Sequence, residues 1–135
     1  MPLGNNLIGL GNGNQGSATA ISRGHAVLFD TATDPNDVVR AAADGATKVA
    51  GIAIEDSDGE SKDFAFCFMG VCLVKNTSGG AITQGNLLIT HADGGVKALA
   101  AEAGAQVIGM ALETSADDDL FSAYICCAPT SELSV

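Results

Sequence analysis

Three sequence blocks occur twice in the same order along this chain. RGHAVLFD at 23–30 is followed later by TQGNLLIT at 83–90, KVAGIAIED at 48–56 by QVIGMALET at 106–114, and DFAFCFMGVC at 63–72 by LFSAYICCAP at 120–129. Gly24 corresponds to Gly85, so the copies lie about 60 residues apart. Two copies of this length are too few for a solenoid. The repeat predicts two similar β units packed into one small domain.

The middle block alternates large and small side chains in both copies. Ala50 and Ile52 point to one face of the expected strand, and Gly51 between them points to the other. Gly109 occupies the position of Gly51 in the second copy. A period of two residues is typical of a β-strand. Small residues within a strand allow another backbone to approach closely. These features predict a mainly β fold, either a compact β-barrel or a β-sandwich.

The third block is apolar on both faces of the expected strand. Phe64, Phe66 and Phe68 share one face, and this block holds three of the five phenylalanines of the chain. Strands that are apolar on both faces are usually buried on both. We therefore predict that these three rings lie in the core or at a subunit interface.

The first 22 residues differ from the rest, because they contain many Gly and Asn residues and no charged side chain. We predict that residues 1–22 form an extended N-terminal arm and that residues 23–135 form a single β domain, with the internal repeat at 23–76 and 83–129. Such a segment becomes ordered when it has a surface to lie against, and a disordered tail is the alternative. The candidate apolar anchors along this arm are Leu3, Leu7, Ile8 and Leu10. Two further segments, 38–43 and 97–103, are compatible with a helix, a short strand or a loop.

The charge balance and the hydrophobic runs narrow the possible partners. The chain has six basic and sixteen acidic residues, so its net charge is −10. This balance argues against a nucleic-acid partner, because phosphate binding depends on Lys and Arg. The longest apolar run, Phe64–Val74, is much shorter than the roughly 20 residues that span a bilayer, so no membrane partner is expected. No signal peptide is recognisable at the N-terminus, so we expect synthesis in the cytosol and reduced cysteines.

No motif in the chain predicts catalysis or a cofactor. Gly11, Gly13 and Gly16 match the spacing of a dinucleotide fingerprint, but the required helix and βαβ context are missing. The two histidines, His25 and His91, do not occupy equivalent positions in the repeat, and no nucleophile elbow is present. We therefore predict no catalytic residue, no cofactor and no enzymatic activity.

Metal binding is not expected either. The four cysteines are Cys67, Cys72, Cys126 and Cys127, and they lack the paired spacing of a zinc site, so small buried hydrophobes are the favoured interpretation. The acidic loops at 56–60 and 117–119 offer too few fixed oxygen ligands for a calcium loop. Solvated loop tips are expected there, with a weak cation site as the alternative.

The repeated blocks resemble the small capsid cement, or head decoration, proteins of tailed phages. The resemblance is carried by Gly24–Val27 with Val49–Glu55, and again by Gly85–Leu88 with Val107–Glu113, within a region from about Arg23 to Pro129. It implies a homotrimer that binds the major capsid protein on the outer surface of an assembled virion and stabilises the shell. Under this resemblance the arm anchors Leu3, Leu7, Ile8 and Leu10 are the candidates for contact with the capsid. It carries over no active-site residue.

A carbohydrate-binding or other ligand-binding β module displayed on a virion is the alternative function. Sugar sites of such modules usually stack the sugar on exposed aromatic rings. This chain has no Trp and one Tyr, which favours the structural role.

Overall fold

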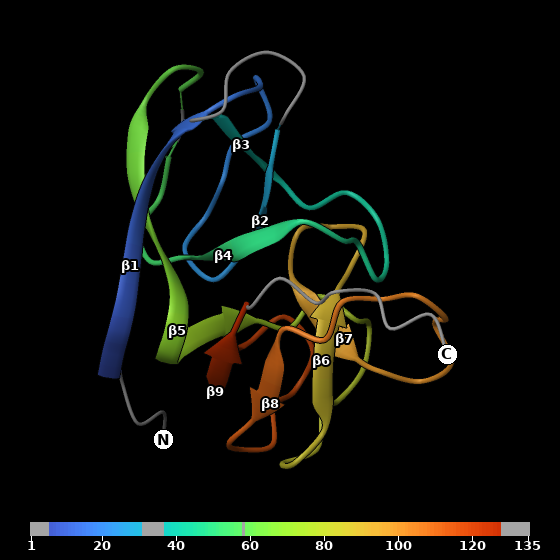
Figure 1. The fold of residues 1–135 in the computed structure, drawn as a ribbon. Helices are drawn as coiled ribbons and strands as arrows, with labels where there is room; N and C mark the ends of the chain where they lie inside the picture. Colours follow the sequence, from blue (N-terminus) through green and yellow to red (C-terminus); the bar gives the residue numbers. More distant parts are fainter. Residues whose placement is uncertain (1–5, 31–36, 58, 128–135) are drawn as a thin grey trace.

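A computed structural model describes residues 6–30, 37–57 and 59–127, which form nine β-strands and no helix (Figure 1). The strands are β1 (Asn6–Gln15), β2 (Ala26–Phe29), β3 (Asp37–Arg40), β4 (Val49–Ala53), β5 (Asp63–Lys75), β6 (Leu87–Thr90), β7 (Val96–Ala98), β8 (Gly109–Ala111) and β9 (Leu120–Cys126). The predicted mainly β fold is confirmed. Of the alternatives left open for 38–43 and 97–103, the structure has the short strands β3 and β7 at the start of these segments. Within the described ranges, no helix is long and apolar enough to cross a membrane.

The first five strands close into a barrel. Their order is β1-β3-β2-β4-β5, and β5 pairs back to β1. The β1–β3 pair is parallel and the other four pairs are antiparallel, so the barrel is mixed. The sheet then continues from β5 through β9, β8, β6 and β7, which lie beside the barrel (Figure 1). The architecture is therefore a closed barrel extended by four strands, not a plain sandwich.

Strand β1 lies within residues 1–22, for which we predicted an extended arm that is ordered against a surface. It is extended, but it pairs with β5 from Asn6 to Asn14 and with β3 at Asn14 and Gln15, so it closes the barrel. Glycine makes this contact possible, because a Cβ on Gly11 would lie only 2.6 Å from the Phe66 ring. The absence of side chains lets aromatic rings of β5 lie directly on the β1 backbone. Residues 6–15 are thus part of the barrel wall.

The second half of the chain repeats the pairing of the first. Strands β9, β8, β6 and β7 pair in the same sequence as β5, β4, β2 and β3. The C-terminal part of β5 takes the place that β1 has in the barrel, since it pairs with β9 as β1 pairs with β5. A parallel bridge between Asn76 and Val96 matches the parallel β1–β3 pair of Gln15 and Val38. The second ring is therefore closed by this bridge alone among the described residues.

Equivalent residues of the two halves make the same hydrogen bonds. The N–H of Gly24 donates to the Ala53 carbonyl at 2.8 Å, and that of Gly85 donates to the Ala111 carbonyl at 2.8 Å. Both glycines have a left-handed φ, 91° and 89°, which a side chain would strain. Ile21 and Ser57 exchange backbone hydrogen bonds, as Ile82 and Ser115 do in the second half. The Glu55 carboxylate accepts the N–H of Ala65, as the Glu113 carboxylate accepts that of Ser122.

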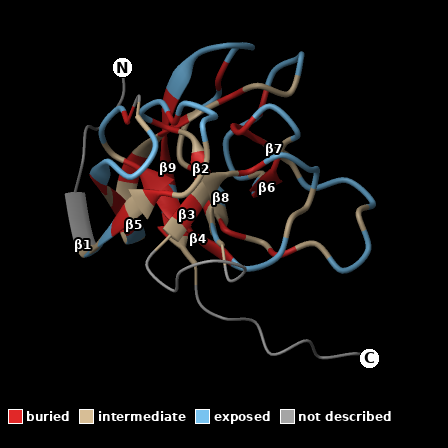
Figure 2. Cartoon of the chain, turned by 90° about the horizontal axis from the view of Figure 1, so that it is seen from above, coloured by how far each residue is buried: buried red, intermediate tan, exposed pale blue. Residues whose placement is uncertain are grey.

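Two buried apolar clusters form the core. The smaller cluster fills the barrel with Ile21, Val27, Val38, Ala50, Ala53, Phe64 and Phe66. The larger fills the second ring and continues onto the outer face of the barrel, where Ala26, Ile52 and Cys67 contribute. Buried residues therefore concentrate on the central strands (Figure 2). The two halves pack through one continuous apolar layer.

Candidate functional site

Of the four candidate capsid anchors, Leu10 has a described side chain. It is 54% exposed on the outer face of β1. Leu7 and Ile8 lie in β1, but their side chains are outside the described part of the structure, as is the whole of Leu3. Leu10 therefore places at least one large apolar side chain on the surface of a segment without charges.

The three phenylalanines of β5 lie in different environments. Phe64 and Phe66 are buried in the barrel, 1% and 6% exposed, with ring centroids 6.4 Å apart. Phe68 is 38% exposed and its ring lies over Gly9. The first two rings therefore pack inside this chain, and Phe68 remains available on the surface.

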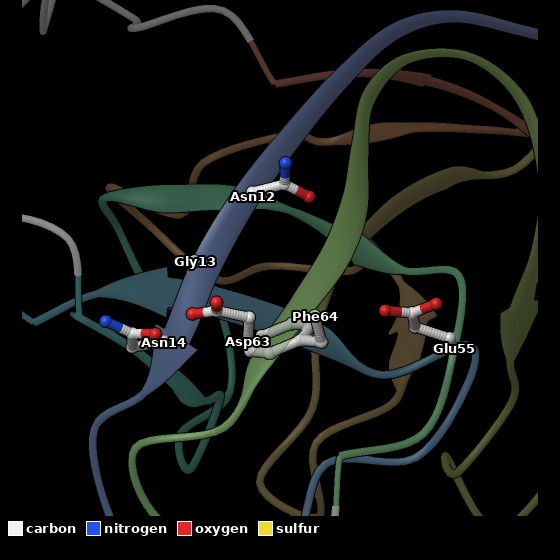
Figure 3. Close-up of a pocket in the computed structure, with 6 residues that line it drawn as sticks. All are labelled: Asn12, Gly13, Asn14, Glu55, Asp63 and Phe64. Carbon is white, nitrogen blue, oxygen red and sulfur yellow. The ribbon is translucent and has the colours of Figure 1, made fainter.

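A shallow groove of about 360 Å³ opens between β1, the segment after β4 and the start of β5 (Figure 3). It is lined by Asn12, Gly13, Asn14, Glu55, Asp63 and Phe64. Glu55 is already used structurally, because its Oε1 accepts a 3.0 Å hydrogen bond from the Ala65 N–H. The groove offers amide and carboxylate groups but no histidine, cysteine or hydroxyl nucleophile. It can make polar contacts with a partner through these amide and carboxylate groups.

Three cysteines contribute to the larger core cluster. Cys67 and Cys72 are fully buried in it, and Cys127 packs against the cluster. A hydrogen bond from Cys72 lowers the pKa of Cys67, and the same bond, together with burial, raises the pKa of Cys72. Burial raises the pKa of Cys127 to about 12. Because Cys67 is inaccessible to solvent, these thiols pack as small apolar groups, and no cluster of three metal-binding side chains occurs in the described residues.

The acidic loops hold the backbone in place. Asp56 Oδ1 accepts a 2.8 Å hydrogen bond from the Arg23 N–H, and Asp117 Oδ1 accepts one of 2.8 Å from the Gly79 N–H. Asp118 forms an ion pair with Lys75 at 3.0 Å. These carboxylates are therefore occupied by protein partners.

His25 also has a structural role. Its Nδ1 accepts a 3.1 Å hydrogen bond from the Ser22 N–H, as the side chain of Asn86 accepts one of 2.9 Å from the Thr83 N–H in the second half. Burial lowers the pKa of His25, and the positive charges of Arg40 and Lys75 lower it further. The neutral imidazole is therefore favoured in the folded protein.

An uncharged row crosses the outer face of the second half. Leu87, Met110 and Tyr124 lie opposite one another on β6, β8 and β9, and Val71 continues the row on β5. The exposed fractions of the first three are 46%, 39% and 41%. Sequence reasoning missed this row because it depends on the register between strands. The signal from which the row could have been found is the position that each of these residues occupies in the repeated blocks.

The structure thus belongs to the class of small all-β proteins built on a closed five-stranded barrel. No protein-family profile matches the chain, and no curated protein matches it in sequence. The crystal structure of the head fiber gp8.5 N base of bacteriophage phi29 is similar, with a TM-score of 0.68. The match covers 92% of this chain and 100% of that chain, at 16% sequence identity. At this identity the likeness shows that the two proteins share a fold.

Proposed function

We propose that this chain is a structural protein of a phage head, attached to the outer surface of the capsid. The observation that carries the proposal is the match to the gp8.5 N base, which covers the whole of that chain, a part of a head fiber. The repeated sequence blocks favour the same kind of protein through their resemblance to head decoration proteins. Fold alone does not fix function, so the surface must also suit attachment.

The surface carries groups that suit attachment. The groove beside β1 is lined by amide and carboxylate groups, and Asp56 and His25 are engaged in backbone hydrogen bonds. Large apolar side chains, among them Leu10 and Phe68, remain exposed on β1 and β5. Exposed apolar area of this kind is available for contact with a partner.

We further propose that the protein acts as a cement and that it works as a homotrimer bound to the major capsid protein. A trimer that contacts several shell subunits must be released from all of them together. Multivalent attachment of this kind gives high avidity from individually modest contacts. The uncharged segment 1–22, with the anchors Leu3, Leu7, Ile8 and Leu10, is the proposed capsid-contact region.

We also propose that the chain is one domain with a duplicated unit. The matched hydrogen bonds at Gly24 and Gly85, and at Ser57 and Ser115, support this proposal. In this proposal β1 is the first strand of the first unit, and the C-terminal part of β5 is the first strand of the second unit.

Co-sedimentation with undecorated phage shells tests the attachment. The wild-type protein should pellet with the shells, and density should appear on their outer surface in electron micrographs. Leu10→Glu places a charge at the proposed contact and should reduce binding at least tenfold. Ala116→Glu adds the same charge on an exposed loop and should bind like the wild type. A wild-type protein that stays in the supernatant at saturating shell concentrations would refute the proposal.

A further inference from the structure

Equivalent residues of the two halves differ sharply in exposure. Ala26, Ile52 and Cys67 form a row across β2, β4 and β5, with the same pairing as Leu87, Met110 and Tyr124 across β6, β8 and β9. The first row is 0% exposed throughout, whereas the second is 46%, 39% and 41% exposed. The positions are equivalent by register, so the difference arises from what covers each row.

A fourth pair of residues shows the same difference. Ala41 donates its N–H to the Ala26 carbonyl at 2.9 Å, and Leu99 donates its N–H to the Leu87 carbonyl at 2.8 Å. Ala41 is 0% exposed and Leu99 is 36% exposed. We call Leu87, Leu99, Met110 and Tyr124 the outer row. Its side chains are on the whole larger than those of the row it corresponds to, although it is the one that faces solvent.

The first row is covered by the second half of the same chain. Thr90, at the end of β6, donates its hydroxyl to the Ala43 carbonyl at 2.9 Å and accepts the Ala46 N–H at 2.7 Å. The Gly94 carbonyl accepts the N–H of Ala26 at 2.7 Å. The β6–β7 end of the second half therefore lies on the outer face of the first half.

The corresponding position in the first half is the last residue of β2, Phe29, which we call the Phe29 end. Thr90 pairs with Val96 as Phe29 pairs with Val38, so Phe29 is the equivalent of Thr90. Phe29 is 47% exposed. By the same equivalence, Phe29 would contact the alanine-rich segment 99–105, which begins at Leu99. An aromatic ring suits this apolar surface, where the smaller Thr90 makes polar contacts in the first half.

We infer that the outer row binds the Phe29 end of a second copy of this chain, so that copies join head to tail. The contact would repeat between molecules the packing that already exists between the two halves of one molecule. The four side chains of the outer row are uncharged, which suits a contact between copies that each carry a net charge of −10. A head-to-tail contact closes into a ring when its rotation allows. The inference goes beyond capsid attachment and stands on the repeat alone.

Sedimentation equilibrium of the purified full chain, without shells, tests the contact. At micromolar concentration the wild type should have a mass of at least twice the 13.5 kDa of the monomer. Met110→Glu should sediment at 13.5 kDa and retain the far-ultraviolet circular dichroism of the wild type, because Met110 lies on the surface. Ala116→Glu should keep the wild-type mass. A monomeric wild type, or a Met110→Glu variant of unchanged mass, would overturn the inference.

Tyr124 provides a second readout, because the chain has one Tyr and no Trp. Its fluorescence should be protected from acrylamide quenching in the oligomer, and the protection should be lost on dilution and in Met110→Glu. Quenching that is independent of concentration would mean that Tyr124 is not at the contact, and it would count against the outer row.

Mixing two variants tests the head-to-tail geometry. Phe29→Glu keeps the outer row intact, and Met110→Glu keeps the Phe29 end intact, so each alone should be a monomer. Their equimolar mixture should form a species of twice the monomer mass. A mixture that stays monomeric would overturn the geometry, because a symmetric row-to-row contact is not restored by mixing. Failure of shell binding by an oligomeric wild type would refute the proposed attachment and leave this inference intact.

Discussion

At Gly51 one added methyl group should disturb the fold clearly. This glycine is buried on β4, next to the residues of β4 that pair with β5. A Cβ at Gly51 would lie 2.9 Å from the carbonyl carbon of Cys67 and even closer to its oxygen, and 2.8 Å from the Phe66 ring. The nearest atoms belong to the backbone of a paired strand, so no side chain can rotate away. Ordinary contact begins at about 3.4 Å, so β4 and β5 must separate by at least half an ångström.

The expected loss of stability follows from this geometry. Overpacking in a core typically costs about 1–3 kcal/mol, and strained hydrogen bonds between β4 and β5 place Gly51→Ala at the upper end of that range. The lower entropy of alanine in the unfolded chain offsets about 0.5 kcal/mol. A net loss of about 2 kcal/mol should lower the melting temperature by roughly 6–10 °C for a domain of this size.

Thermal unfolding followed by circular dichroism measures this loss. Gly80→Ala is the matched control, because Gly80 is exposed and nothing lies within 4 Å of the position that its added methyl group would take. The control should melt within about 1 °C of the wild type. If Gly51→Ala melted as high as the control, β4 and β5 would not be as close as described, and the argument from close approach would fail.

Three further outcomes are expected. His25→Asn should flatten the fall in melting temperature below pH 6.5. Burial lowers the pKa of His25 in the folded state, so the unfolded state binds the proton more readily and acid destabilises the wild type. Asn86 shows that an amide makes the same bond, and an unchanged pH profile would contradict this prediction. Ser57→Ala should cost about 1–3 kcal/mol in urea titrations, because it removes the 2.7 Å hydrogen bond to the buried Gln15 side chain, and a loss below about 0.5 kcal/mol would argue against that bond. Deleting residues 1–15 should abolish cooperative unfolding, since β1 closes the barrel, whereas a sharp melt would mean that β1 is a dispensable arm.

The repeated blocks allowed the strands and their close approach to be predicted from the sequence. Gly51 and Gly109 were expected to let a neighbouring backbone approach, and both lie against the carbonyl of a paired strand. Period-two alternation marks strand positions because side chains point to opposite faces. Local patterns of this kind are visible in a single sequence.

The place of β1 was not predictable from the repeat, because residues 6–15 share almost no letters with the segment of β5 that takes the same position. The available signal was glycine at every second position, Gly9, Gly11 and Gly13, which marks one face of a strand. This pattern has meaning once the partner is known, since Phe66 and Phe68 occupy the space above Gly11 and Gly9. Which residues lie opposite one another depends on tertiary register, and composition does not determine it.

The candidate site shows the same limit. Leu10 was expected to be a surface anchor, and it is exposed, but the alignment of Leu87, Met110 and Tyr124 requires three strands in register. The sequence assigns each residue to a strand face, and only the pairing shows that the three are neighbours. The difference in burial between the two halves likewise becomes visible after folding.

Strand β5 runs without interruption from Asp63 to Lys75 and serves both halves, pairing with β1 and β4 at one end and with β9 at the other. Gly70, whose φ is 123°, lies in this strand between the two rings, and the strand is paired on both sides of it. A force applied to one ring would reach the other through this shared strand and would load the inter-strand hydrogen bonds of both rings. Because the two rings share β5, calorimetry should record their unfolding as one transition.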